Sequence, residues 1–405
     1  MRSEAHVRKL GFDPERLERI QTWMERYVDA GKLPFAATLI SRHGEPVWQG
    51  HTGQRDVEAG TAYEPDTIAR IYSMTKPVTA VGLMMLHEQA LFHLDDPIAE
   101  FLPEFADLQV LRKGARKLDD VEALSVKPTI HNLFTHTAGL TYGFQGGMLG
   151  EAYAKADVDF NPDGAGLAAT TKKLAGMPLL FQPGGEWNYS VATDVLGRLI
   201  EVISGRPLDQ YLSENIFAPL GMTDTGFEVP DDKIDRLASC YVPDEQNGMA
   251  LNENSQDSKY RAGKVKTFSG GGGLLSTGGD YQRLAEMLRR GGNAGNERLL
   301  SPRTIEFMAS NHLESDLASM GPATWCETSF SGVGFGLGVS VILNPAKAQL
   351  AASVGDYGWG GMASTVFWID PVEDMSVVYL TQLIPSDTYA LRKELRTLVY
   401  QALVD

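Results

Sequence analysis

The chain has 405 residues, with 52 acidic against 36 basic side chains and a formal net charge of −16. A chain of this length usually exceeds what one hydrophobic core organises, so two domains are expected. The negative charge argues against nucleic acids and anionic membranes as partners, because both are polyanions. No apolar run approaches the roughly 20 residues of a membrane helix, and the first 20 residues lack the apolar core of a secretory signal, so we expect a cytoplasmic protein.

The first predicted element is an amphipathic helix that follows Asp13. Asp13 is the expected N-cap, Pro14 the first helical residue, and Gly31 the residue that ends the helix. Its apolar face comprises Leu17, Ile20, Met24, Tyr27 and Val28. Next, residues 35–53 have the pattern of two strands around the turn His43-Gly44-Glu45.

Helical segments and long loops dominate from about residue 73 to 224, and strands return near the end of the chain. The predicted strands are GFGLGVSVIL, ASTVFWID and MSVVYLTQLI, followed by a helix over about 388–403. The sequence therefore predicts an α+β (α/β) fold, in which strands from both ends form one antiparallel sheet flanked by the first and last helices. We assign residues 1–90 and 225–405 to this sheet-containing domain and residues 91–224 to an inserted, mainly helical domain.

A lysine stands three residues after a serine in the stretch SMTK, residues 73–76, just before Pro77. Proline is tolerated only in the first turn of a helix, so the helix begins near Ser73, and the Lys76 amine can reach the Ser73 hydroxyl from the same face. A serine becomes a nucleophile when a neighbour accepts its proton, and N–H groups at a helix start can stabilise an oxyanion. Taken alone, however, this short motif is better explained by a capping serine beside a solvated lysine.

Two further sequence blocks are, taken singly, equally weak evidence for a catalytic site. Tyr189 precedes a helix for which Ser190 is the expected N-cap and Gly205 the expected end, so a lone tyrosine there would be a packing residue. Glycines in VGDYGWGGMASTVFWID precede a strand and allow a close backbone approach, although isolated glycines more often mark a bulge.

Together the blocks resemble one family. Ser73-Met74-Thr75-Lys76, Tyr189-Ser190-Val191 and Trp359-Gly360-Gly361 are similar, in order and spacing, to the serine hydrolases of the class C beta-lactamase fold, and most closely to the family VIII carboxylesterases. The stretches LFTHTAGL, FAPLGMTDTGF and GGGGLLSTGGDYQRLAEML extend the likeness nearly from end to end. The resemblance implies this fold, with an active site at the interface of the two domains.

The resemblance also implies roles for individual residues. Ser73 would be the nucleophile that is acylated, and either Tyr189 or Lys76 would be the base, the lysine charge favouring the phenolate. The N–H groups of Ser73 and Met362 would form the oxyanion hole, with Gly360 and Gly361 keeping that sheet edge open.

Two departures from the beta-lactamase pattern bear on the substrate. Where those enzymes carry Lys-Thr-Gly and Tyr-x-Asn, this chain has Trp359 instead of the cation and Val191 instead of the asparagine. Loss of a charge-assisted hydrogen bond should weaken discrimination for anionic substrates by about one to two decades, whereas an indole suits a neutral ester. Tyr142 and Tyr357 are expected to add aromatic wall to the substrate site, and loops 143–175 and 241–266 to shape it.

The expected activity is hydrolysis of small neutral, short-chain acyl esters through an acyl-serine intermediate. The alternatives are an acyltransferase using the same site, a beta-lactamase or D-amino-peptide hydrolase, and a penicillin-binding protein that does not turn over. No metal or organic cofactor is expected. His87-Glu88 lacks the second histidine of a zinc motif, the run from Gly270 to Gly273 lacks the end of a phosphate loop, and Cys240 and Cys326 are expected to be ordinary thiols.

Overall fold

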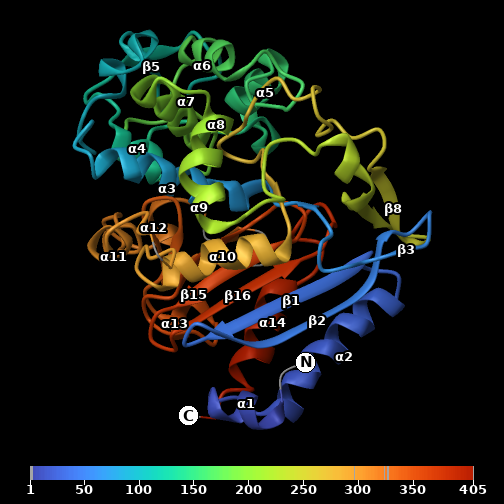
Figure 1. The fold of residues 1–405 in the computed structure, drawn as a ribbon. Helices are drawn as coiled ribbons and strands as arrows, with labels where there is room; N and C mark the ends of the chain where they lie inside the picture. The colour runs from blue at the N-terminus through green and yellow to red at the C-terminus, as the bar shows by residue number, and fades with distance from the viewer. Residues whose placement is uncertain (1–2, 296, 323, 326–327, 405) are drawn as a thin grey trace.

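The structure of the protein is a computed structural model, which describes residues 3–295, 297–322, 324–325 and 328–404. A helical part lies above a sheet with helices on both of its faces (Figure 1). The two chain ends lie together below the sheet, where the Asp13 N–H donates to the Ala402 carbonyl at 2.8 Å. Cys240 is a buried free thiol, while the prediction for Cys326 falls outside the described residues.

One antiparallel sheet joins the two ends of the chain, as the sequence predicted. Its strand order is β12-β13-β14-β15-β16-β1-β2-β3. Strand β1 pairs with β16, with Ala37 opposite Leu380 and Arg42 opposite Met375, so the N-terminal hairpin continues the C-terminal strands. The strands are β1 (Phe35–Arg42), β2 (Glu45–Asp56), β3 (Thr61–Ala62), β12 (Val333–Phe335), β13 (Ser340–Ile342), β14 (Tyr357–Gly360), β15 (Val366–Asp370) and β16 (Met375–Leu380).

Helices cover both faces of this sheet (Figure 1). On β15, Phe367 and Ile369 belong to the larger hydrophobic core, whereas Val366 and Trp368 belong to the core beneath the terminal helices. This alternation is the two-residue period of a strand buried on both faces. Helix α10 packs on one face, and α2 and α14 lie on the other. The helices of this part are α1 (Glu4–Lys9), α2 (Pro14–Asp29), α10 (Gly278–Arg289), α11 (Pro302–Met308), α12 (Leu317–Met320), α13 (Pro345–Ala348) and α14 (Leu391–Tyr400).

The helical part lies on the α10 side of the sheet and packs on α3 (Thr75–His87) (Figure 1). Its helices are α4 (Ile130–Phe134), α5 (Gly147–Ala156), α6 (Leu167–Ala175), α7 (Ala192–Ser204), α8 (Leu208–Leu212) and α9 (Ala218–Leu220). The remaining short strands are β4 (Ala69–Arg70), β5 (Gln109–Leu111), β6 (Val121–Ala123), β7 (Cys240–Asp244), β8 (Gly248–Glu253), β9 (Leu275–Ser276), β10 (Thr324–Trp325) and β11 (Thr328–Ser329). The domain boundaries at 90/91 and 224/225 stay predictions.

Several predicted elements need correction. GFGLGVSVIL is not one strand, because β12 and β13 form a hairpin in which Phe335 pairs with Ser340. Strand β14, which carries Trp359, lies between β13 and β15 and is not an edge strand. However, β13 pairs only with Tyr357 and Gly358, so among the described strands Trp359 and Gly360 pair with β15 only, and the predicted open edge is kept at this end of the strand. The N-cap of α7 is Val191 rather than Ser190, whose hydroxyl instead accepts from the Ala192 N–H at 3.3 Å.

The structure confirms the predicted start and apolar face of helix α2. The Asp13 carboxylate accepts hydrogen bonds from the N–H groups of Glu15 and Arg16, and Pro14 is the first residue of the helix. The buried face includes Trp23 in addition to the predicted apolar residues Leu17, Ile20 and Met24.

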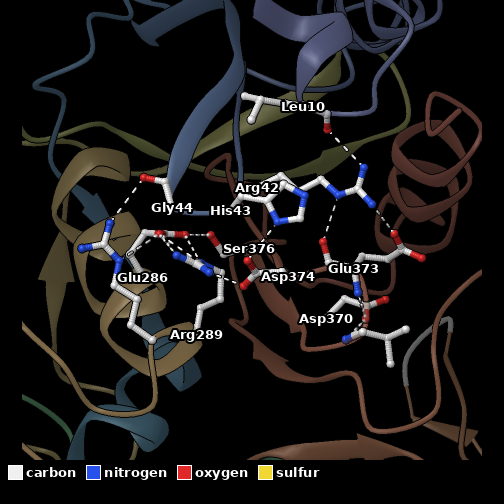
Figure 2. A network of polar contacts seen from close by, with 12 residues as sticks. Leu10, Arg42, His43, Gly44, Glu286, Arg289, Asp370, Glu373, Asp374 and Ser376 are labelled. Atoms are coloured by element: carbon white, nitrogen blue, oxygen red, sulfur yellow. Dashed lines mark hydrogen bonds and ion pairs between the residues drawn. The ribbon is translucent and has the colours of Figure 1, made fainter. Parts of the chain in front are cut away.

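A polar network fastens the end of the sheet that lies away from Gly360 (Figure 2). The Arg42 guanidinium donates to the Glu373 carboxylate at 2.7 Å and to the Leu10 carbonyl at 3.1 Å, and so joins β1 to the β15–β16 turn and to the end of α1. On α10, Arg289 pairs with the Asp374 carboxylate, which also contacts the His43 ring. These contacts fix strand ends and leave the opposite ends of the strands for the candidate site.

Of the helices that the structure describes, none has both the length and the apolar character needed to cross a membrane.

Candidate active site

Ser73 lies in a tight 3₁₀ turn, η1 (Tyr72–Met74), that runs directly into α3. Pro77 is the third residue of α3, so its missing N–H falls in the first turn, where a helix needs no such donor. Tyr72 has a left-handed φ of 44°, a conformation that a non-glycine residue keeps only when its surroundings hold it. The predicted helix start at Ser73 is confirmed.

The Lys76 side chain is buried beside Ser73, and its amine has three acceptors. Its Nζ lies 3.2 Å from Ser73 Oγ, 2.9 Å from the Tyr142 hydroxyl and 2.7 Å from the Gly271 carbonyl oxygen. Only 1% of the lysine is exposed, so these groups replace the water that would solvate the amine. An ammonium would use all three of its donors here, whereas a neutral amine could accept the Ser73 proton.

Two tyrosine rings enclose the lysine amine. Nζ of Lys76 lies 4.5 Å from the centroid of the Tyr189 ring and 5.3 Å from that of the Tyr142 ring. Burial, together with the nearby Tyr189 and Asp194, raises the pKa of the Tyr142 phenol well above its usual value. Tyr142 therefore stays a neutral phenol whose oxygen accepts from Lys76. The sequence predicted Tyr142 as substrate wall, and the structure adds this contact.

The loop that carries Tyr189 is fixed by the LFTHTAGL stretch. The Asn188 N–H donates to the His136 carbonyl at 3.0 Å, and the His136 Nδ1 lies 3.0 Å from the Ser190 hydroxyl. Burial lowers the pKa of His136 well below its usual value, with Lys76 adding to the effect, so this imidazole is neutral. Gln145 also donates to the Tyr189 carbonyl at 2.8 Å.

Trp359, at the end of β14, reaches the same group of side chains. Its indole N–H donates to the Tyr189 hydroxyl at 3.3 Å, and the two ring centroids lie 5.5 Å apart. A Cβ on Gly361 would lie 2.3 Å from the Ile71 carbonyl oxygen, closer than real Cβ atoms approach. Glycine is thus required for the end of β14 to pass beside the segment before Ser73. As a result, Ser73 and Met362 line one cavity.

A buried carboxylate that the sequence analysis missed is linked to Lys76 through the main chain of Gly271. Asp194, on α7, accepts from the Ser269 hydroxyl at 2.5 Å and from the Gly271 N–H at 3.0 Å. The carbonyl of the same Gly271 accepts from Lys76. Burial raises the pKa of Asp194 to about 6, against a lowering by the charge of Lys76. The sequence did contain a signal for this residue, because Asp194 is an acidic residue next to Val195 on the apolar face of a predicted helix.

Replacing Asp194 with asparagine is expected to change how stability depends on pH. The folded-state pKa of Asp194 lies near 6, above the usual 3.8, so the folded protein binds this proton more tightly and loses stability as the pH rises from about 4 to 6. Asp194→Asn lacks that loss. The stability of the variant relative to wild type should therefore increase by about 2–3 kcal/mol between pH 4 and pH 8.

Thermal unfolding across this pH range checks the Asp194 prediction. Asp232→Asn, at an exposed position, is the matched control, and its melting temperature should change with pH in parallel with that of wild type. A constant difference in melting temperature between Asp194→Asn and wild type from pH 4 to pH 8 would contradict the prediction.

The cavity beside Ser73 has a volume of about 950 Å³. Both loops that were expected to shape it do line it, with Phe144 and Phe160 from residues 143–175 and Tyr260 from residues 241–266. Helix α14 contributes Arg392 from the other side. Sequence reasoning did not connect this helix with the site, because the contact depends on how the C-terminal helix packs on the sheet.

Two residues predicted for the substrate site lie elsewhere. Val191 is fully buried in the hydrophobic core and is not among the described residues that line the cavity. Tyr357 is buried beside Pro77 and Leu288, away from the cavity. Tyr357 and Trp359 lie two residues apart on β14 and both pack on the larger hydrophobic core, but only Trp359, nearer the end of the strand, lines the cavity.

Comparisons with known proteins match nearly the whole chain to one family and fold. The beta-lactamase family profile matches residues 20–401. Esterase EstB from Burkholderia gladioli is 30% identical over 378 residues, covering 90% of this chain and 89% of that protein. Monacolin J acid methylbutanoyltransferase from Aspergillus terreus is 29% identical over 347 residues, covering 82% and 81%. The solved structure of EstCE1, a hydrolase with promiscuous acyltransferase activity, matches with a TM-score of 0.81 at 28% identity and covers 95% of this chain and 99% of that one.

Proposed function

This chain belongs to the beta-lactamase family, and from that premise we propose that it is a serine carboxylesterase acting on small neutral esters. The family match and the likeness to EstB and EstCE1 confirm the predicted fold and the predicted resemblance to the family VIII esterases. The esterase and acyltransferase relatives support a serine hydrolase or an acyl-transfer activity. The ester class and the role of each residue are our proposal.

In the proposed mechanism, Ser73 Oγ attacks the ester carbonyl carbon while its proton passes to the Lys76 and Tyr189 pair. The carbonyl oxygen takes up negative charge and is held by the N–H groups of Ser73 and Met362. Collapse of this intermediate returns the proton to the leaving alcohol and leaves an acyl-serine. Water then attacks the acyl carbonyl by the same route, releasing the acid and restoring Ser73.

The contact between Lys76 Nζ and Ser73 Oγ, at 3.2 Å in a buried site that opens to a cavity, is the observation that carries this proposal. The aromatic rings of Trp359 and Tyr189 favour a neutral substrate. Arg392, which also lines the cavity, donates to the carbonyls of Gly361 and Thr365.

Steady-state hydrolysis of p-nitrophenyl esters from acetate to octanoate, beside a chromogenic cephalosporin, tests the substrate class. We expect the short esters to turn over faster than the anionic cephalosporin by at least about one to two decades in kcat/KM, since the carboxylate-binding cation is replaced by Trp359. A faster cephalosporin rate would contradict the neutral-ester proposal and favour a beta-lactamase.

A second candidate is acyl transfer to an alcohol. A cavity of about 950 Å³ exceeds the needs of a short ester and leaves room for an acceptor, and relatives include an acyltransferase. The two activities differ in whether an alcohol competes with water for the acyl-serine. Product analysis with added alcohol separates the two activities. A ratio of transfer ester to free acid above the molar ratio of alcohol to water would support the transferase. A ratio at or below that value would support the hydrolase.

A further inference from the structure

Arg392 bonds to the main chain next to the predicted oxyanion hole. This residue, on α14, donates from Nη2 to the Gly361 carbonyl at 2.8 Å and to the Thr365 carbonyl at 3.3 Å. The Thr365 carbonyl also accepts from the Gly361 N–H at 2.9 Å. One guanidinium thus holds both ends of the turn that follows β14.

The Gly361 carbonyl and the Met362 N–H belong to the same peptide unit. In a trans peptide the C=O and the N–H point in opposite directions, so a guanidinium that fixes the carbonyl also fixes the direction of the N–H. A positive charge at the carbonyl oxygen draws electron density toward it. The N–H of Met362 therefore becomes a stronger donor on the side away from Arg392.

We propose that Arg392 is a positioning residue for the oxyanion hole, which orients and polarises the Met362 N–H through the Gly361 carbonyl. This inference rests on the proposed function of the site. Arg392 does not need to touch the reacting atoms for this role. Its neighbour on the helix, Arg396, is instead paired with the buried Asp356 carboxylate through two hydrogen bonds, at 2.5 and 3.0 Å.

The first glycine of the Trp359-Gly360-Gly361 block fits the same role. A Cβ on Gly360 would lie 2.6 Å from Cζ of Arg392, so the guanidinium occupies the space that a side chain at 360 would take. Any residue larger than glycine at this position would displace the guanidinium from the Gly361 carbonyl. Gly360 is therefore required for the contact between α14 and the end of β14.

Kinetics of Arg392→Met with p-nitrophenyl butyrate tests this inference. We expect kcat to fall about 10- to 100-fold while KM changes less than about 3-fold, because the lost interaction strengthens only as the oxyanion forms. Affinity for a trifluoromethyl ketone, whose adduct with Ser73 places an oxyanion in the hole, should fall by the same factor as kcat. Arg392→Lys should recover part of the loss.

Two further variants make the outcome decisive. Gly360→Ala displaces the guanidinium without removing it and should reproduce the loss in kcat and in ketone affinity. Arg303→Met, whose side chain is 88% exposed on α11, is the matched loss of one positive charge and should leave both values unchanged. Wild-type kcat and ketone affinity in Arg392→Met would overturn the inference while leaving Ser73-dependent ester turnover intact. Absence of ester turnover in the wild type would overturn the proposed function as well.

Discussion

Replacing Ser73 with alanine is expected to lower ester hydrolysis by about 10⁴- to 10⁶-fold, which is the size of effect seen when a serine hydrolase loses its nucleophile. The hydroxyl of Ser73 lies 3.2 Å from the Lys76 amine, and its position at the start of α3 lets N–H groups stabilise charge on the attacked carbonyl. Alanine removes the only atom that forms the acyl bond, so whatever turnover remains would come from water.

Two measurements check the Ser73 prediction. Wild type should react with a fluorophosphonate to give one stable adduct that peptide mapping places on Ser73, and Ser73→Ala should give none. Ser204→Ala is the matched control, because the Ser204 hydroxyl donates to the Ile200 carbonyl at the end of α7, away from the cavity. Ester turnover that survives in Ser73→Ala would assign the nucleophile to another residue.

Local sequence signals predicted the parts of the fold that depend on neighbours along the chain. Asp13 and Pro14 predict the start of α2, and Pro77 predicts the start of α3. Both signals are local, because an N-cap side chain and a proline without an N–H affect only the first turn of a helix. The sequence pattern predicts one strand where β12 and β13 form a hairpin, because the glycines inside GFGLG interrupt the alternation without adding a polar turn. No local rule distinguishes such a turn from a glycine-rich strand.

The candidate site likewise has some contacts that follow from local spacing and others that depend on the packing of distant segments. The contact between Ser73 and Lys76 follows from helical spacing, and was predicted. Asp194 and Arg392 act through main-chain groups of Gly271 and Gly361, more than 30 residues away along the chain in each case. Only the packing of α7 and α14 brings these pairs together, so their roles could not be read from spacing.

Replacing Tyr189 with phenylalanine is expected to lower kcat by about 10²- to 10⁴-fold, the usual contribution of a positioned acid or base. Tyr142→Phe is the matched variant and should cost only about 5- to 10-fold, the value of one hydrogen bond. The difference follows from their surroundings. The Tyr142 phenol is held neutral by burial and serves as an acceptor for Lys76, at 2.9 Å, whereas the Tyr189 hydroxyl accepts from the Trp359 indole beside the cavity.

Pre-steady-state acylation, measured from the burst of p-nitrophenol, separates this proton-transfer role from binding. A slower burst in Tyr189→Phe with unchanged KM would support Tyr189 as the group that exchanges protons with Ser73. If Tyr142→Phe instead showed the larger loss, Tyr142 would have to be the phenolate that takes the Ser73 proton through Lys76. Its assignment as a neutral phenol would then be wrong, and Tyr189 would serve to shape the cavity with Trp359. Equal and small losses in both variants would leave Lys76 as the base, since it is the amine within 3.2 Å of the Ser73 hydroxyl.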